Sequence, residues 1–400
     1  MSLSNGRSYL AIPGPSVIPD EVLRAMHRPS PNIYEGELVE TTHSIIPDLK
    51  YVAKTAKNVA IYIANGHGAW EAALANMVDD GDGVLVAATG RFAHGWADMA
   101  HRLGVSSEIL EFGNQSPLDA GAIEKALRRD TNKKIKAILI THVDTSTSVK
   151  NDIVAVRHAM DAVDHPSLLA VDCIASLGCD DFEMDAWGVD VMVAGCQKGL
   201  MVPPGLSFVY FSNKAKEMQK KLSRVSSYWD WTPRIAPEIY YEYFCGTAPV
   251  HHIYGLRKAL DMIKREGLEA IFQRHERHAR ALWAAVECWG RNGGTMQMNI
   301  KDPTHRSRAV TALSIGAPDG TRLRRWVEEN AGLTLGIGLG MNSEADPNAD
   351  GFFRIGHMGH VNAQMIMGLI GTIETGLCAL RIPHGSSAVE AAAKTLALSF

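Results

Sequence analysis

The sequence predicts an α/β protein. It has a large domain, built on a mostly parallel, buried sheet flanked by helices, and a smaller C-terminal α/β domain. Two observations lead to this fold class. Short runs of Val, Ile, Leu and Ala are nearly continuous rather than alternating with polar residues, which is typical of strands buried on both faces. Amphipathic stretches separate most of these runs, and such alternation implies right-handed crossovers between parallel strands.

The strands of the large domain are expected where the apolar runs lie: Val59–Ile63, Val84–Ala88, Lys136–Thr141, Leu168–Asp172, Val189–Ala194 and Leu206–Phe211. Helices are expected after the first three of them, at Trp70–Val78, Ala93–Leu103 and Asp152–Val163. The last two strands are joined by Gly199–Gly205, which is too short for a crossover helix, so this pair is predicted to be antiparallel.

The pattern changes near residue 250. Two helices split at Gly267 are followed by a strand, a helix, a strand and a helix: His252–Glu266, Leu268–Trp289, Ala309–Ile315, Arg322–Asn330, Phe352–Ile355 and Ala363–Ala379. Residues 1–20 are rich in proline and are expected to be extended and to lie across one of the domains. We therefore predict an N-terminal arm over residues 1–20, a large domain over 21–260 and a small domain over 261–400.

Composition excludes several classes of protein. The 400 residues carry 40 basic and 44 acidic side chains, and a net charge of −4 favours neither nucleic acid nor an anionic membrane as a partner. No apolar run approaches the roughly 20 residues that span a bilayer. Pro13 and Pro15 interrupt the only apolar stretch near the start, so no signal peptide is expected. Six cysteines without C-x-x-C spacing favour reduced thiols and a cytoplasmic protein.

Ligands bind at the carboxyl ends of the strands in an open parallel sheet, and two charged residues stand out there. Lys198 ends an apolar strand and precedes Gly199–Gly205, which offers no carboxylate to pair with it. A lysine desolvated in this way has a lowered pKa and becomes a usable nucleophile, although an exposed lysine at a loop start is the alternative. Asp172 has apolar neighbours and needs a cationic or hydrogen-bonded partner. A protonated pyridine nitrogen is one such partner; a structural ion pair or a helix N-cap is the alternative.

A glycine turn follows the first of these strands. Gly66-His67-Gly68 opens the next helix, and a helix N-terminus behind glycines presents free N–H groups to a phosphate. The alternative is that His67 only caps the helix. The third glycine of a dinucleotide fingerprint is absent, and so are G-K-[ST] and G-x-S-x-G, so neither a dinucleotide site, a P-loop nor a hydrolase elbow is supported.

Three longer stretches, Gly66–Leu74, Asp185–Asp190 and Gln197–Gly205, join these features into one pattern. Together they resemble the class V aminotransferases of fold type I, which depend on pyridoxal phosphate, and specifically the branch of serine–glyoxylate and alanine–glyoxylate aminotransferases. The resemblance runs from Pro13-Gly14-Pro15 to Arg354–Gly359. It implies transfer of an amino group from a small amino acid (serine, alanine or aspartate type) to a 2-oxo acid such as glyoxylate or pyruvate. It also implies a homodimer with active sites at the subunit interface.

The resemblance also implies a function for individual residues of the large, cofactor-binding domain and its neighbours. Lys198 matches the lysine that bonds to pyridoxal 5′-phosphate and moves the proton, and Asp172 matches the partner of the pyridine nitrogen. Phe92 and Ile174 match the residues on the two faces of the ring, and Thr145 the hydroxyl near the ring oxygen. The remaining positions match residues that bind the phosphate (Gly66, His67, Asn65, Gln197 and, from the other subunit, Thr247) and the substrate carboxylate (Arg354).

Some positions depart from the family pattern. Asn65 stands where the family usually has Ser. This change weakens the argument that an intact phosphate cup makes against pyridoxamine–pyruvate aminotransferase, which stays an alternative. Phe244 stands where some relatives have Tyr, a change that bears on donor specificity. A class V lyase or desulfurase is the other alternative, but neither Cys245 nor Cys378 lies in the glycine- and serine-rich loop that a desulfurase needs. A nicotinamide-dependent dehydrogenase and a non-catalytic binding module fit the residues less well.

No metal site is expected. His275 and His278 lie three residues apart without H-E-x-x-H spacing, so we interpret them as part of a solvated helix face. The glycine-rich run Gly336–Gly340 has no helix directly after it and is interpreted as a flexible segment near the mouth of the active site.

Overall fold

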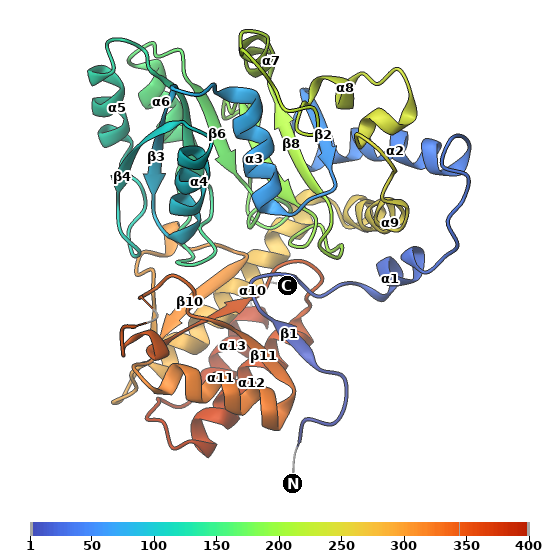
Figure 1. Ribbon diagram of the computed structural model, residues 1–400. Coiled ribbons are helices and arrows are strands. Elements are labelled where there is room, and N and C mark those ends of the chain that lie inside the picture. The colour runs from blue at the N-terminus through green and yellow to red at the C-terminus, as the bar shows by residue number, and fades with distance from the viewer. Residues whose placement is uncertain (1–2, 344, 398–400) are drawn as a thin grey trace.

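The computed structural model describes residues 3–343 and 345–397 and contains two β-sheets, the larger above the smaller in Figure 1. The larger sheet has the strand order β2-β8-β7-β6-β5-β3-β4. Its strands are β2 Asn58–Tyr62, β3 Gly83–Ala88, β4 Ser106–Glu111, β5 Ile135–Thr141, β6 Leu168–Asp172, β7 Val191–Gly195 and β8 Ser207–Phe211. Strand β8 is antiparallel to β2 and β7, and every other neighbouring pair is parallel. The predicted mostly parallel sheet and its antiparallel last pair are therefore confirmed.

Helices cover both faces of this sheet. Along β5, Ala137 and Leu139 pack toward the face covered by α3 and α4, whereas Ile138 and Ile140 pack toward the opposite face. All four side chains are buried, at about 1.5–3 kcal/mol for each large aliphatic one, which explains why the run has no polar residue. The helices of this part are α1 Asp20–Met26, α2 Glu37–Val52, α3 Gly66–Met77, α4 Arg91–Arg102, α5 Ala120–Arg129, α6 Ile153–Asp161, α7 Asn213–Gln219, α8 Thr232–Ile235 and α9 Val250–Glu266.

The smaller sheet combines the two ends of the chain. Its order is β1-β11-β12-β10-β9, with β1 parallel to β11 and the other pairs antiparallel. Its strands are β1 Tyr9–Ala11, β9 Gln297–Met298, β10 Val310–Ser314, β11 Leu333–Ile337 and β12 Phe352–Gly356. Helices α11 Asp319–Ala331, α12 Ala363–Ala379 and α13 Ala388–Ala397 contribute to its core. The run Gly336–Gly340 is thus wrongly predicted as flexible throughout, because it begins inside β11.

Helix α10, Leu268–Trp289, connects the two cores. Its first turns bury Ile271 and Phe272 against the core of the larger sheet, and its last turns bury Leu282 and Trp289 in the core of the smaller one. Because one helix belongs to both cores, the domain boundaries at residues 20 and 260 stay predictions.

The histidines of α10 correct a second expectation. His275 and His278 are buried rather than solvated. Nδ1 of His275 donates to the Ile271 carbonyl, and its Nε2 accepts from the Gly359 amide. The imidazole is therefore neutral, and it links α10 to the segment after β12. Within residues 3–343 and 345–397, no three His, Cys, Asp or Glu side chains are grouped to hold a metal ion.

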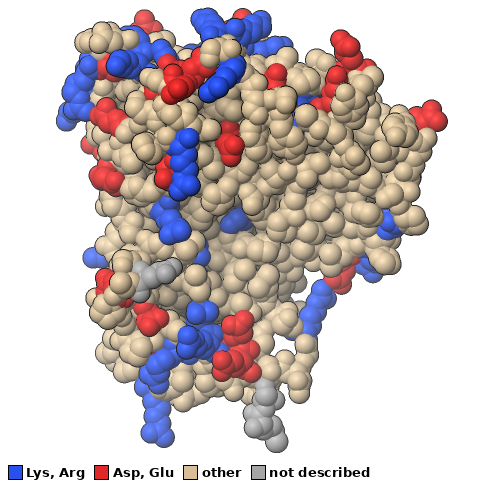
Figure 2. All heavy atoms as spheres, viewed as in Figure 1, with Lys and Arg blue, Asp and Glu red and all other residues tan. Residues whose placement is uncertain are grey.

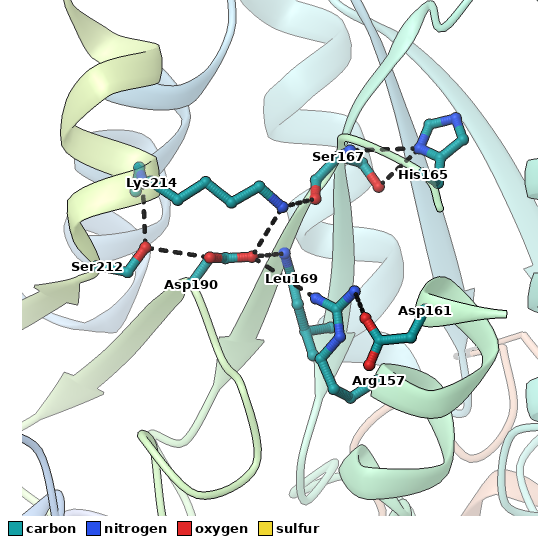
Figure 3. A network of polar contacts seen from close by, with 9 residues as sticks. Arg157, Asp161, His165, Ser167, Leu169, Asp190, Ser212 and Lys214 are labelled. Carbon is teal, nitrogen blue, oxygen red and sulfur yellow. Dashed lines mark hydrogen bonds and ion pairs between the residues drawn. The ribbon is translucent and has the colours of Figure 1, made fainter. Parts of the chain in front are cut away.

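A buried carboxylate holds the amino-terminal edge of the larger sheet. Asp190 accepts hydrogen bonds from the Leu169 amide at 3.0 Å and the Ser212 hydroxyl at 3.1 Å, and pairs with Lys214 at 3.5 Å (Figure 3). These contacts join the start of β6 to the end of β8. The Asp185–Asp190 motif therefore stabilises the edge opposite the strand ends where ligands bind.

The surface agrees with the modest net charge. Figure 2 shows acidic and basic side chains side by side along the top and left of the viewed face, and few charges over its centre. None of the helices in the described part of the chain is long and apolar enough to cross a membrane.

Candidate active site

A cavity of about 170 Å³ lies where β5, β6 and β7 end and α3 begins. It brings together most of the predicted site residues: Asn65, Gly66, His67, Phe92, Thr145, Asp172, Ile174, Gln197 and Lys198. Gly14, Pro15, Trp70 and Pro204 complete its wall. Segments more than 180 residues apart in the chain thus meet at one strand-end edge, as expected for an open parallel sheet.

Lys198 is buried just past β7, where the N-terminal arm covers it. Its Nζ donates to the Pro13 carbonyl, and the Ser16 hydroxyl donates to the Lys198 carbonyl at 2.7 Å. Burial, together with the nearby Arg354 cation, lowers the pKa of Lys198 to about 8, although Asp172 opposes the shift. The amine is therefore in large part neutral, and nucleophilic, at mildly alkaline pH.

Asp172 is the last residue of β6 and is buried in the same cavity. Its Oδ2 accepts from Trp70 Nε1 at 2.9 Å, and its Oδ1 accepts from the Ile174 amide at 2.7 Å. Burial raises the pKa of Asp172 to about 7, although these two hydrogen bonds and the Lys198 charge oppose the shift. Trp70, which sequence reasoning did not single out, therefore orients this carboxylate.

The N-terminus of α3 closes one end of the cavity. The Asn65 side chain is its N-cap, and Oδ1 accepts from the His67 amide at 3.1 Å and the Gly68 amide at 3.4 Å. The pKa of His67 is lowered by partial burial and by Arg91. Oε1 of Gln197 is buried and has no hydrogen-bond partner in the described part of the chain. This amide can turn its NH₂ group toward an anion at the helix end.

Two apolar side chains lie along the cavity between these polar ends. Phe92, in the first turn of α4, meets the Trp70 ring edge to face at 6.2 Å between centroids. Ile174 packs so closely against Gly66 that a Cβ on that glycine would overlap it. A flat ring between Phe92 and Ile174 would contact apolar atoms on both of its faces.

A second cavity of about 350 Å³ adjoins the first and shares Gly14, Phe92, Thr145 and Lys198 with it. Arg354 of β12 lines this second cavity. Its Nη1 donates to the Thr145 carbonyl at 2.8 Å and its Nε to the Ile337 carbonyl at 2.7 Å. Burial lowers the pKa of Arg354 to about 10. No carboxylate forms an ion pair with this guanidinium among residues 3–343 and 345–397, so it can bind one from a ligand.

Thr247 is the predicted site residue that the single chain does not bring to either cavity. It is exposed in the segment between η1, Tyr240–Tyr243, and α9. Cys245 and Cys378 are also exposed and line neither cavity, so neither thiol faces Lys198. The six cysteines are all unpaired, and four of them are buried.

A buried amine and a buried carboxylate thus lie together beside a helix N-terminus, at the strand-end edge where open parallel sheets bind ligands. The model of the family "Aminotransferase class-V" matches residues 8–355. The chain belongs to this family and is an aminotransferase.

Similar proteins of this family carry the names of aminotransferases. The serine–glyoxylate aminotransferase of Methylorubrum extorquens is 37% identical over 381 residues, covering 93% of this chain and 91% of the relative. The L-aspartate–glyoxylate aminotransferase of Paracoccus denitrificans is 36% identical over 376 residues, with coverage of 93% and 91%. The crystal structure of the alanine–glyoxylate aminotransferase of a Nostoc species superposes with a TM-score of 0.81 at 28% identity, covering 93% of this chain and 96% of that one.

Proposed function

We propose that this aminotransferase uses pyridoxal 5′-phosphate to move an amino group from a small amino acid, of the serine, alanine or aspartate type, to a 2-oxo acid such as glyoxylate or pyruvate. The observation that carries the proposal is the shared cavity of Lys198 and Asp172, closed at one end by the N-terminus of α3. The cofactor supplies an aldehyde and a ring that withdraws electrons.

The residues around the first cavity fit that cofactor. The helix N-terminus at Gly66 and the Gln197 amide, turned so that its NH₂ group faces the cavity, suit its phosphate. Phe92 and Ile174 suit the two faces of its ring, and Thr145, which lines the same cavity, would contact the ring oxygen. The Asp172 carboxylate would pair with the protonated ring nitrogen. This positive charge would stabilise the ionised carboxylate, which burial alone disfavours.

The remaining groups handle the substrate. Arg354 binds the carboxylate that an amino acid and an oxo acid have in common, so one guanidinium serves both halves of the reaction. Lys198 Nζ, once neutral, takes the proton from the Cα of the donor. It later returns a proton at the corresponding carbon of the acceptor. Because donor product leaves before the acceptor binds, kinetics are expected to be ping-pong.

The test begins with the cofactor-free protein and pyridoxal 5′-phosphate. Uptake is followed by visible absorbance, and its rate should rise with pH through about 8, because only the neutral Lys198 amine reacts. Serine, alanine and aspartate are then offered with glyoxylate or pyruvate, and the amino acid product is measured. Lys198→Ala should abolish the absorbance and the turnover, while Lys394→Ala, a change at an exposed side chain of α13, should leave both unchanged. A protein that takes up no cofactor and transfers no amino group from any donor ends the proposal.

A second candidate is pyridoxamine–pyruvate aminotransferase activity, in which the vitamin without its phosphate is a substrate. The capping side chain of Asn65 favours it, because it occupies two N–H groups that would otherwise face a phosphate. Pyridoxal and its phosphate are compared in the same uptake assay. Equal affinity for both, with turnover of pyridoxamine and pyruvate, would select this alternative.

We also propose that the chain acts as a homodimer in the cytoplasm. Thr247 can reach a phosphate only in the cavity of a partner subunit, because it lies outside both cavities of its own chain. Six unpaired cysteines support a reducing compartment.

A further inference from the structure

A second buried carboxylate lies beside the first cavity, in the segment after β5. Asp144 has no exposed surface and uses both of its oxygens. Its Oδ2 accepts from the Phe92 amide at 3.0 Å, at the start of α4. Its Oδ1 accepts from the Ser146 amide at 2.9 Å and the Ser146 hydroxyl at 2.5 Å. One side chain therefore joins the first turn of α4 to the segment after β5, although Phe92 and Asp144 are 52 residues apart in the chain.

The two joined segments carry residues of both cavities. Phe92 lines the first cavity and the second, and its own amide is the group that Asp144 holds. Thr145 lies between Asp144 and Ser146, and its carbonyl accepts from Arg354. The position of the Arg354 guanidinium thus depends on the turn that Asp144 fixes.

We propose that Asp144 is a positioning residue for the reaction: its carboxylate holds the Phe92 ring over the cofactor site and, through the Thr145 carbonyl, keeps Arg354 in place for the substrate carboxylate. This inference rests on the proposed function, because it assigns Phe92 and Arg354 the roles given there. Asp144 itself lines neither cavity and acts only through these neighbours.

The chemistry of the contacts requires a carboxylate rather than an amide. The donors on the two sides are N–H and O–H groups, and each side uses a different oxygen of Asp144. Asparagine has a single acceptor oxygen, so its NH₂ group would oppose an N–H donor on one side or the other. Gly90 packs directly against the Asp144 carboxyl group, because a Cβ on Gly90 would lie 2.5 Å from the carboxyl carbon. The side chain at position 144 therefore has little room to adopt another orientation.

Two variants and a matched control test the proposal. Asp144→Asn removes one acceptor, and Gly90→Ala displaces the carboxylate without altering its charge; the φ of Gly90 is 164°, which any residue adopts. Asp180→Asn is the control. Asp180 is also buried and also accepts from a backbone amide and a serine hydroxyl, Arg308 N and Ser307 Oγ, but it lines neither cavity.

The first readout is hydrogen exchange of the cofactor-free protein, measured by mass spectrometry on peptides that contain Phe92 and Ser146. Both test variants should exchange at least about tenfold faster there, whereas Asp180→Asn should match wild type in these peptides. The second readout is steady-state kinetics of the loaded enzyme. KM for donor and acceptor should rise about tenfold together, with a smaller change in kcat, because Arg354 binds both carboxylates.

Unchanged exchange in Asp144→Asn overturns the proposal. So does faster exchange with unchanged KM, since Asp144 would then be only structural. If Asp144→Asn does not fold, the same two readouts on Gly90→Ala decide the matter. Failure of the proposed function is distinct: wild type would then neither take up cofactor nor transfer an amino group, and the exchange measurement would still show whether Asp144 holds the two segments.

Discussion

Lys198 and Asp172 have pKa values shifted toward each other, and burial is the main cause of both shifts. Desolvation lowers the pKa of the amine to about 8 and raises that of the carboxyl to about 7. Both groups can therefore change charge near neutral pH, and a change of charge on one shifts the pKa of the other. This is the electrostatic condition for a site that must bind a charged cofactor and also move protons.

The raised pKa of Asp172 predicts how stability depends on pH. Ionising the buried carboxyl in the folded cofactor-free protein lowers the free energy of unfolding. This loss of stability is absent below the ordinary pKa of 3.8 and complete above about 7. Asp172→Asn lacks this cost but loses a hydrogen bond, and the lost bond does not depend on pH. The difference in free energy of unfolding, variant minus wild type, should therefore increase from pH 5 to pH 8.

Urea unfolding of both cofactor-free proteins at these two pH values measures the difference. A difference that stays constant or decreases toward pH 8 would contradict the assignment of a desolvated Asp172. In the loaded protein the trend should weaken, because a protonated ring nitrogen compensates the carboxylate.

Sequence reasoning placed Lys198 and Asp172 at the strand ends, where the structure has them line one cavity, but it did not single out the groups that orient them. Lys198 and Asp172 are conspicuous because each is a charge at the end of an apolar strand. Trp70, Asp144 and Ser16 act through partners 102, 52 and 182 residues away, and no spacing rule in a single sequence connects them. The sequence marks these three residues only by their position, since all of them lie in segments next to strand ends or glycine turns.

Among the secondary-structure elements, strands buried on both faces were the predictable ones. Strand β6 has the predicted bounds because all of its residues are buried and its four apolar residues belong to the two cores on either face. Strand β4 escaped prediction because it lies at the sheet edge and is largely exposed, so its sequence, SSEILE, is mostly polar. Strands β1 and β11 pair with each other from opposite ends of the chain, and β11 contains a glycine, so neither has a local signature.

The turn after β1 supplies a prediction at this scale. Gly14 has a φ of +105°, and a Cβ on it would come within 2.5 Å of Lys198 Nζ. Gly6 has a φ of +140° and nothing within 4 Å, which makes it a matched control in the same arm. Alanine at either position should cost about 1–3 kcal/mol of backbone strain. Only Gly14→Ala should also displace the amine.

Thermal unfolding and cofactor uptake separate the two effects. We expect similar losses of Tm in both variants, but slower and weaker uptake of pyridoxal phosphate only in Gly14→Ala. Equal uptake by the two variants would show that the arm does not confine Lys198.

At the scale of the whole molecule, the proposed dimer explains exposed apolar side chains. Ile239 and Tyr241 precede Thr247 in one segment and are both 53% exposed. Exposed apolar side chains next to a predicted site residue are what a subunit interface requires.

Mixed subunits test this prediction. Lys198→Ala and Thr247→Asp should each be inactive alone, the second because a negative charge would face the phosphate. Random mixing should restore about a quarter of wild-type activity, because half of the dimers then contain one complete site of two. Lys198→Ala mixed with Asp172→Asn is the control and should restore nothing, since both residues belong to the same chain's cavity. Equal behaviour of the two mixtures would contradict a shared site.

The short path from β1 to Lys198 has a mechanical consequence. Tyr9–Ala11 is hydrogen bonded into the smaller sheet, and Pro13, two residues later, accepts from the amine at the end of β7 in the larger one. Any rocking of one sheet against the other would therefore move this carbonyl relative to the nitrogen. Such a movement would couple the relative position of the two sheets to how readily the nucleophile loses its proton.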